Sequence, residues 1–340
     1  MTISELEKEL KNNKINNLYV FYGEEKYLLD MYLKKIKKIF GETVKGINYI
    51  QIDESNIYNL ISDIETPAFG YDRKLIIIKN TGILKSEGKK KNAKMVQYRE
   101  ELLNYFKENI DDIKIANNIV FIEDDIDSKE KLVQYLIKNG EECNFEKQRL
   151  QTIVARLKSI CNAYRVNVRD DDLKYLIESC GTSMQDLINE VRKLIEFAGE
   201  NGSINREDID ALCTKQIEAV IFDLTDSLGK KDINSSLLYL KNLLYNKEPI
   251  QKIFITLYNH FKKIYFTKLA LIQNKDIATA LNLKPNQIFL TKKYKAQSEY
   301  FTKKELENIL KEFIELDENI KSGLIDINIG LESILSKYCS

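Results

Sequence analysis

The chain has 340 residues, of which 44% are hydrophobic and 31% are charged, and its 52 lysines and arginines balance its 52 aspartates and glutamates. This composition is typical of folded globular domains and excludes a disordered chain. The even charge argues against a protein that coats nucleic acid through bulk positive charge, and the length provides for two or three domains.

About the first 145 residues alternate between predicted strands and helices. Short apolar runs predict strands at 18–22, 48–53, 75–78 and 119–122, and helical periodicity lies between them. The last two runs are apolar without alternation, which is typical of strands buried on both faces of a parallel sheet. We therefore expect an α/β domain over residues 1–145.

The remainder of the chain is predicted to be helical. Residues 146–214 show apolar positions at helical spacing, and Ser183 with Asp186 and Asn205 with Asp208 have the spacing of capping boxes. Residues 215–340 continue the helical pattern, with breaks at Pro249 and Pro285. The changes in periodicity predict three domains: 1–145, 146–214 and 215–340.

The first predicted strand ends at Gly23-Glu24-Glu25-Lys26, where a phosphate-binding loop would lie. A working loop needs G-x-x-x-x-G-K-[ST], and both the second glycine and the Lys-Ser/Thr pair are missing here. Glu24 and Glu25 would also oppose phosphate at the start of the following helix. These residues predict a degenerate loop that does not bind nucleotide. The acids after residue 122 are interpreted as a solvated strand end rather than a magnesium site.

The connection before the third strand contains two large aromatic residues. Pro67 ends a predicted helix, Gly70 permits a sharp turn, and Phe69 and Tyr71 flank that glycine. Connections lie at the surface, so this pair could anchor a partner. Packing into the core of the domain is the alternative, and the periodicity does not choose between them.

Two basic clusters could contact phosphate groups. The first consists of Lys85, Lys89, Lys90, Lys91 and Lys94. The second consists of Lys292, Lys293, Tyr294 and Lys295, in which the tyrosine could stack on a base. For both clusters a solvated surface is the simpler interpretation.

No catalytic residue, cofactor or metal site is expected. With a single histidine, His260, a histidine-based metal site or catalytic triad is improbable. The five cysteines are scattered, which predicts reduced, buried thiols. They are Cys143, Cys161, Cys180, Cys213 and Cys339. The absence of an apolar span and of a secretory pattern predicts a cytoplasmic address without a membrane partner.

Five segments in order resemble the DNA polymerase III delta subunit family of bacterial clamp loaders. The first two are the strand-Gly-Glu-x-x-Tyr-Leu pattern at 18–28 and the Phe-containing turn that leads into an apolar strand at 66–80. The others are Glu190-Val191-Arg192-Lys193-Leu194, the segment 221–229, and Lys321-Ser322-Gly323 followed by Leu331-Glu332. Each is weak alone, but their order over the whole chain is specific.

The resemblance implies an AAA+-like domain with a P-loop-type parallel sheet, then a helical lid, then an all-α collar that mediates assembly. It implies a subunit of the DNA polymerase III holoenzyme that opens the beta sliding clamp without hydrolysing ATP. The implied partners are the clamp, the delta-prime and gamma or tau subunits, and primed DNA within the assembled loader.

The implied clamp contact comprises Pro67, Ala68, Phe69, Gly70 and Tyr71. The family usually has Leu-Phe or Pro-Phe here, so Phe69 carries over directly, while Ala68 is a smaller anchor that Tyr71 would have to supplement. The sequence leaves two other functions open: an active AAA+ ATPase and a general helical scaffold.

Overall fold

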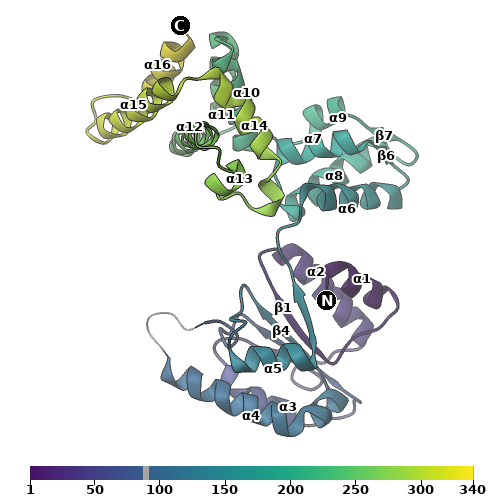
Figure 1. Cartoon of the computed structure of the whole chain (residues 1–340). Coiled ribbons are helices and arrows are strands. Elements are labelled where there is room, and N and C mark those ends of the chain that lie inside the picture. Colours follow the sequence, from purple (N-terminus) through teal and green to yellow (C-terminus); the bar gives the residue numbers. More distant parts are fainter. Residues whose placement is uncertain (87–91, 340) are drawn as a thin grey trace. The chain divides into compact units, whose positions relative to one another are not determined.

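The computed structural model describes residues 1–86 and 92–339, which divide into two compact units, Met1–Lys147 and Gln148–Ser340. The first unit contains a five-stranded parallel sheet in the order β2-β3-β4-β1-β5. The second is almost entirely helical, as Figure 1 shows. The predicted fold class, a parallel α/β region followed by helices, is therefore confirmed.

The elements of the first unit alternate along the chain. They are α1 (Ile3–Lys11), β1 (Leu18–Tyr22), α2 (Lys26–Phe40), β2 (Tyr49–Ile52), η1 (Ile57–Asn59), α3 (Leu60–Glu65), β3 (Lys74–Lys79), α4 (Ala93–Ala116), β4 (Asn117–Glu123), α5 (Lys131–Asn139) and β5 (Glu141–Asn144). All four predicted strands form. The edge strand β5 was not predicted, because Cys143 is its only apolar residue.

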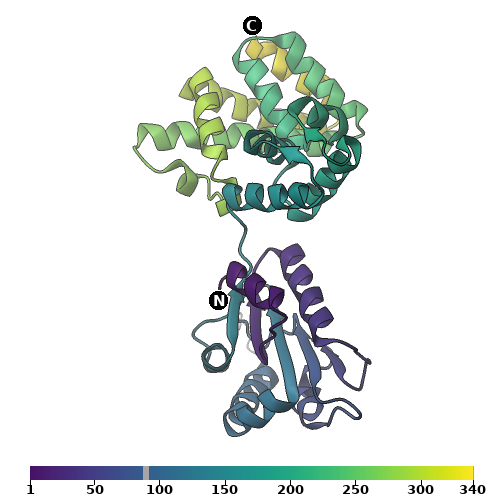
Figure 2. The same cartoon turned by 90° about the vertical axis from the view of Figure 1, so that its right-hand side faces the viewer.

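Helices cover both faces of the sheet (Figure 1; Figure 2). Side chains alternate across a strand, so Leu18 and Val20 of β1 join the core beneath α3, α4 and α5. Phe21 points to the other face, where its ring lies 5.2 Å from that of Phe145, which in turn lies 6.0 Å from Tyr32 of α2. Strands buried on both faces explain the unbroken apolar runs of β3 and β4.

The second unit begins with helices that flank a small two-stranded sheet. They are α6 (Leu150–Ala163), β6 (Asn167–Val168), α7 (Asp170–Cys180), α8 (Met184–Ala198), β7 (Ser203–Ile204) and α9 (Arg206–Leu212). Ser183 caps α8 by accepting from the N–H of Asp186, and Asn205 and Asp208 form a complete capping box at α9. The predicted capping box is therefore complete at α9, whereas at α8 only the bond to the Ser183 side chain is present.

The rest of the second unit packs around a separate apolar core. Its elements are α10 (Ile217–Gly229), α11 (Ile233–Tyr245), α12 (Ile250–Ile272), α13 (Ile277–Ala280), η2 (Pro285–Gln287), α14 (Leu290–Tyr300), α15 (Lys303–Lys321) and α16 (Ile327–Cys339). Asn286 donates to Thr182 at 2.6 Å, and Lys293 pairs with Glu178 at 2.8 Å, so the two helical groups touch. The predicted division near residue 214 stays a prediction.

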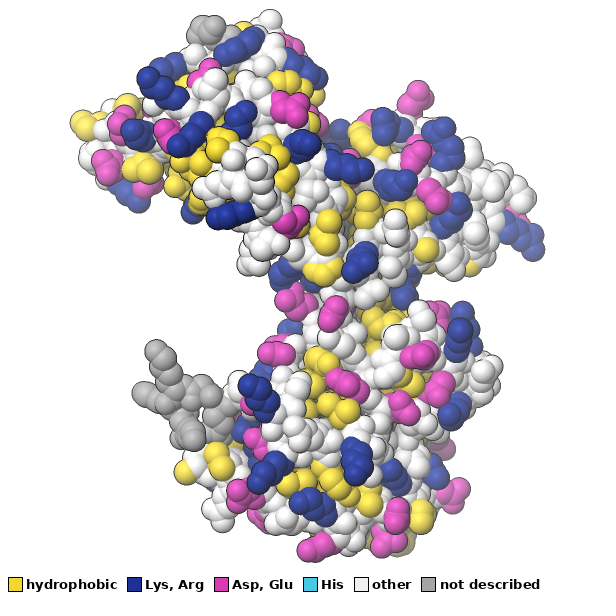
Figure 3. Space-filling model, viewed as in Figure 1, with side chains coloured by type: hydrophobic (Ala, Val, Ile, Leu, Met, Phe, Trp, Pro, Cys, Tyr) yellow, Lys and Arg dark blue, Asp and Glu magenta, His cyan; other side chains and the backbone are white. Residues whose placement is uncertain are grey.

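The outer surface carries charges of both signs. On the face drawn in Figure 3, basic and acidic side chains are intermixed over each unit. This pattern agrees with the balanced composition. Within the described residues, no helix is long and apolar enough to cross a bilayer.

Candidate functional site

The turn from Pro67 to Tyr71, called here the Phe69 turn, connects α3 to β3. The N–H of Tyr71 donates to the carbonyl of Ala68 at 2.9 Å, and Gly70 adopts a φ of +82°, which is strained for residues that carry a Cβ. The Phe69 side chain is 87% exposed. The alternative that Phe69 packs into the core is therefore wrong, and the turn displays a large apolar side chain to solvent.

The other residues of the Phe69 turn are less prominent. Pro67 and Gly70 are exposed, whereas Ala68 and Tyr71 are half-buried. Phe69 is thus the dominant apolar group that the turn presents. A second anchor from Ala68 or Tyr71 stays a prediction.

A buried lysine braces the start of this turn. Lys74, at the beginning of β3, is 2% exposed, and its ammonium donates to the carbonyls of Asp63, Ile64 and Thr66 at the end of α3. Burial lowers the pKa of Lys74, while the Asp63 carboxylate raises it. The last carbonyls of a helix have no N–H donors within the helix. The Lys74 ammonium supplies the missing donors and so ties α3 to β3. Sequence reasoning did not single out Lys74.

The degenerate loop after β1 is filled by the protein's own main chain. Gly23 has a φ of +127°, and a Cβ placed on it would lie 2.4 Å from the carbonyl oxygen of Phe145. The N–H of Phe145 donates to the Tyr22 carbonyl at 2.6 Å, and the N–H of Glu25 donates to the Phe145 carbonyl at 2.9 Å. The Glu25 amide, which a phosphate loop would direct at its ligand, is therefore already bound.

The charges around this loop are also satisfied internally. Glu25 is 3% exposed and pairs with Lys147 at 3.2 Å. Lys26, the lysine of the degenerate loop, pairs with Asp124 at 3.0 Å instead of standing free for a phosphate.

The acidic end of β4 is neutralised in the same way. Glu123 is buried, not solvated as the sequence suggested, and accepts from Thr81 and from the N–H of Gly82 at 3.1 and 2.7 Å. Lys85 lies 3.4 Å from Glu123 and 3.8 Å from Asp124. Burial raises the pKa of Glu123, whereas the hydrogen bond from Lys26 lowers that of Asp124. Lysine ammonium groups thus lie where a magnesium ion would be needed.

The two predicted basic clusters do not form open phosphate sites as a whole. In the first, Lys85 is held by Glu123, Lys94 lies over the Tyr58 ring, and Lys89, Lys90 and Lys91 lie outside the described residues. In the second, Tyr294 is 3% exposed and packs against Phe222 and His260, so its predicted stacking on a base is wrong.

The lysines of the second cluster differ in accessibility. Lys293 pairs with Glu178 at 2.8 Å, while Lys292 and Lys295 are exposed on α14. DNA contact by these lysines stays a prediction. The sequence did not predict the burial of Tyr294 because the helix Leu290–Tyr300 is mostly polar in sequence. One face of this helix is nevertheless buried, and it consists of Tyr294, Gln297 and Ser298.

His260 is buried, and its Nε2 lies 2.7 Å from the side-chain oxygen of Gln297. Burial lowers the pKa of His260 from 6.5 to about 3. Between these two values the imidazole is neutral in the folded chain but protonated in the unfolded chain. We therefore expect the free energy of unfolding to fall as the pH drops below 6.5, with a contribution of about 1.4 kcal/mol per pH unit. Urea unfolding of the native chain and of His260→Gln between pH 7.5 and 5 checks this; equal slopes would contradict it.

Four of the predicted reduced thiols lie in residues whose side chains are described. Cys143, Cys161 and Cys180 are buried, and Cys213 is half-buried rather than buried. Among the described residues, one set of three donors could hold a metal ion: Cys180, Glu190 and Cys213. It belongs to the second unit and not to the Phe69 turn.

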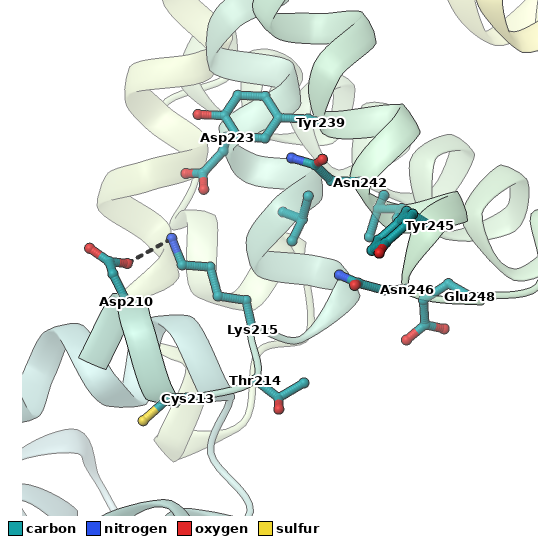
Figure 4. A pocket seen from close by; sticks show the side chains of 12 residues that line it. Asp210, Cys213, Thr214, Lys215, Asp223, Tyr239, Asn242, Tyr245, Asn246 and Glu248 are labelled. Carbon is teal, nitrogen blue, oxygen red and sulfur yellow. Dashed lines mark ion pairs between the residues drawn. The ribbon is translucent and has the colours of Figure 1, made fainter. Parts of the chain in front are cut away.

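A hollow of about 550 Å³ lies in the second unit between the α9–α10 connection and α11. Figure 4 shows Lys215 reaching toward Asp210, 3.0 Å away, with Tyr245 and Asn246 on the other side. Its residues form no nucleophile–base pair. The hollow therefore does not suggest an active site.

Two curated relatives align over nearly the whole chain. DNA polymerase III subunit delta of Bacillus subtilis is 26% identical, with 96% of this chain and 94% of the relative covered. The probable DNA polymerase III subunit delta of Aquifex aeolicus is 28% identical, with 86% and 83% covered. The solved DNA clamp loader delta protein of Bacillus subtilis has a similar fold, with a TM-score of 0.71, 23% identity and 99% of each chain covered.

The five-stranded parallel sheet and the helices that follow define a protein with an α/β domain ahead of a helical region. The model of the family DNA polymerase III, delta subunit, matches residues 19–146, and that of the DNA polymerase III delta subunit, C-terminal domain, matches residues 218–338. The chain belongs to the DNA polymerase III delta subunit family.

Proposed function

We propose that the chain is the delta subunit of a bacterial clamp loader and that it binds and opens the beta sliding clamp during DNA replication. The observation that carries this proposal is Phe69, 87% exposed at the tip of a braced turn, at the position where the family resemblance implies the clamp contact. Co-elution of the purified chain with its cognate clamp tests the proposal. A chain that elutes apart from the clamp would contradict it and would favour a general scaffold.

The energetics of Phe69 suit a docking anchor. Burying a phenylalanine side chain contributes roughly 1.5–3 kcal/mol, and that gain is unused while the ring is in water. Aromatic side chains that fill a pocket on a partner dominate many interfaces. Because Lys74 ties the end of α3 to β3, little ordering of the turn would oppose binding.

The first unit is proposed to act without hydrolysing ATP. Phe145 fills the space next to Gly23, Lys147 pairs with Glu25, and lysines neutralise the acids at the end of β4. Nucleotide binding would require these contacts to break and the carboxylates to accept phosphate beside them. The alternative of an active AAA+ ATPase is disfavoured for that reason.

We expect no ATP turnover by the isolated chain and no saturable binding of a fluorescent ATP analogue. The native chain and Lys26→Ala should behave alike, because Lys26 is committed to Asp124. Steady-state phosphate release and an equilibrium titration check this. Turnover that is lost in Lys26→Ala would overturn the prediction.

The helices from residue 217 onward are proposed to form the collar that joins the delta-prime and gamma or tau subunits, with primed DNA bound by the assembled loader. Several large apolar side chains are exposed there, as expected for an assembly surface. They include Leu238, Tyr245, Ile255, Ile272, Ile314, Leu324 and Ile329.

A further inference from the structure

Three potential metal ligands meet in the first helical group of the second unit. Cys180 is the last residue of α7, Glu190 lies in α8, and Cys213 directly follows α9. Their two sulfur atoms and one carboxylate oxygen all lie within 4.8 Å of one another. No element of the proposed clamp-loader function uses these side chains.

We propose that Cys180, Cys213 and Glu190 bind one thiophilic divalent cation, zinc, with water as the fourth ligand. Thiolate and carboxylate are both zinc ligands, and thiolates select zinc over the hard cations that prefer oxygen alone. A tetrahedral zinc ion would separate these donors by about 3.6–3.8 Å, given its bond lengths to sulfur and oxygen. The donors, which lie within 4.8 Å of one another, would have to close to that spacing on binding.

The site is held together by the backbone rather than by the ion. The N–H of Gln216 donates to the carbonyl of Ser179 at 2.9 Å, which places the segment after α9 beside the end of α7. Lys193 of α8 donates to the carbonyl of Leu212 at 3.3 Å, next to Cys213. All three donors are therefore fixed on elements that are already joined.

The charges around the donors also suit a bound cation. Two thiolates and a carboxylate exceed the charge of one zinc ion by a single negative charge, and Lys193, 2.7 Å from Glu190, would balance it. A carboxylate has two oxygens, so Glu190 can keep this ion pair with one and contact the metal with the other.

The donors lie beside the hollow of about 550 Å³. Cys213 is at its edge in Figure 4 with its sulfur directed away from the hollow, Cys180 is buried, and Glu190 is partly exposed. Once bound, the ion would link α7, α8 and the end of α9. Binding only to the folded chain would raise its melting temperature.

The test uses the full chain, reduced and freed of metal, titrated with zinc in competition with a chromogenic chelator. We expect one zinc ion per chain and, with cobalt in its place, the absorption of a thiolate–cobalt bond. Cys213→Ser and Glu190→Gln should each weaken zinc binding by at least roughly a hundredfold. Losing a direct metal ligand should cost more affinity than losing a residue that only hydrogen-bonds to a ligand. Cys161→Ser, a buried thiol of α6, is the matched control and should bind as the native chain does.

Three results would overturn the site. These are zinc binding that is equal in the native chain and in the Cys180→Ser/Cys213→Ser double variant, cobalt spectra without a thiolate band, or no zinc bound by the fully reduced chain. Melting curves of each variant without metal establish that it is folded. The outcome is independent of clamp binding, so neither proposal stands or falls with the other.

Discussion

Replacing Phe69 with alanine should weaken binding to the sliding clamp at least about thirtyfold, because an apolar anchor truncated at an interface costs about 2 kcal/mol or more. The melting temperature should be unchanged, since the ring is 87% exposed and supports no core. Isothermal titration of the clamp and a thermal melt of the same variant measure both quantities.

The matched control is Phe197→Ala. Phe197 lies in α8 of the second unit and is 65% exposed, so its truncation removes the same ring from a surface with no proposed clamp contact. It should bind the clamp like the native chain. Equal weakening by both variants, or undiminished binding by Phe69→Ala, would refute the role of the Phe69 turn.

Replacing Lys74 with methionine should lower the free energy of unfolding by about 2–4 kcal/mol, because three carbonyls at the end of α3 lose their partner in a buried position. Clamp binding should also weaken, even for the folded protein, because Thr66, whose carbonyl Lys74 holds, directly precedes the Phe69 turn. Urea unfolding and a clamp titration well below the melting temperature separate the two effects.

Lys79→Met provides the comparison for Lys74. Lys79 ends the same strand, but it is 45% exposed and pairs with Asp30 at the surface, so its loss should cost less than about 1 kcal/mol. Comparable destabilisation by the two substitutions would show that Lys74 does not brace the turn.

The sequence predicted the central strands because their apolar runs are unambiguous. It did not predict β5, in which Glu141, Glu142 and Asn144 surround a single apolar residue. That strand forms through pairing with β1, a long-range contact that no local pattern records. Its omission also concealed Phe145, which follows the strand and fills the degenerate loop.

The sequence predicted the parts of the candidate site that depend on neighbouring residues in the chain, and it did not predict the parts that depend on distant ones. Pro67 and Gly70 indicated a turn, and the family resemblance identified Phe69 as the expected anchor. Only the structure shows that the Phe69 side chain is exposed. Lys74 reads as an ordinary charged residue before a strand, since its three carbonyl partners lie 8 to 11 residues away.

The proposed zinc ligands were hidden for a related reason. The sequence predicted no metal site because it has a single histidine and its cysteines are scattered. Cys180 and Cys213 come together only when Gln216 joins the end of α7. Glu190 appeared in the sequence only as part of a helix motif typical of the family.

Crosslinking from position 69 tests the central claim most directly. A photoreactive phenylalanine analogue placed at residue 69 is irradiated in a mixture of the full chain and the cognate clamp, and the linked peptides are sequenced. We expect a crosslink within the peptide-binding pocket of the clamp, which excess pocket-binding peptide prevents. A complex that forms but yields no crosslink from residue 69, or a crosslink that the peptide does not prevent, would contradict it.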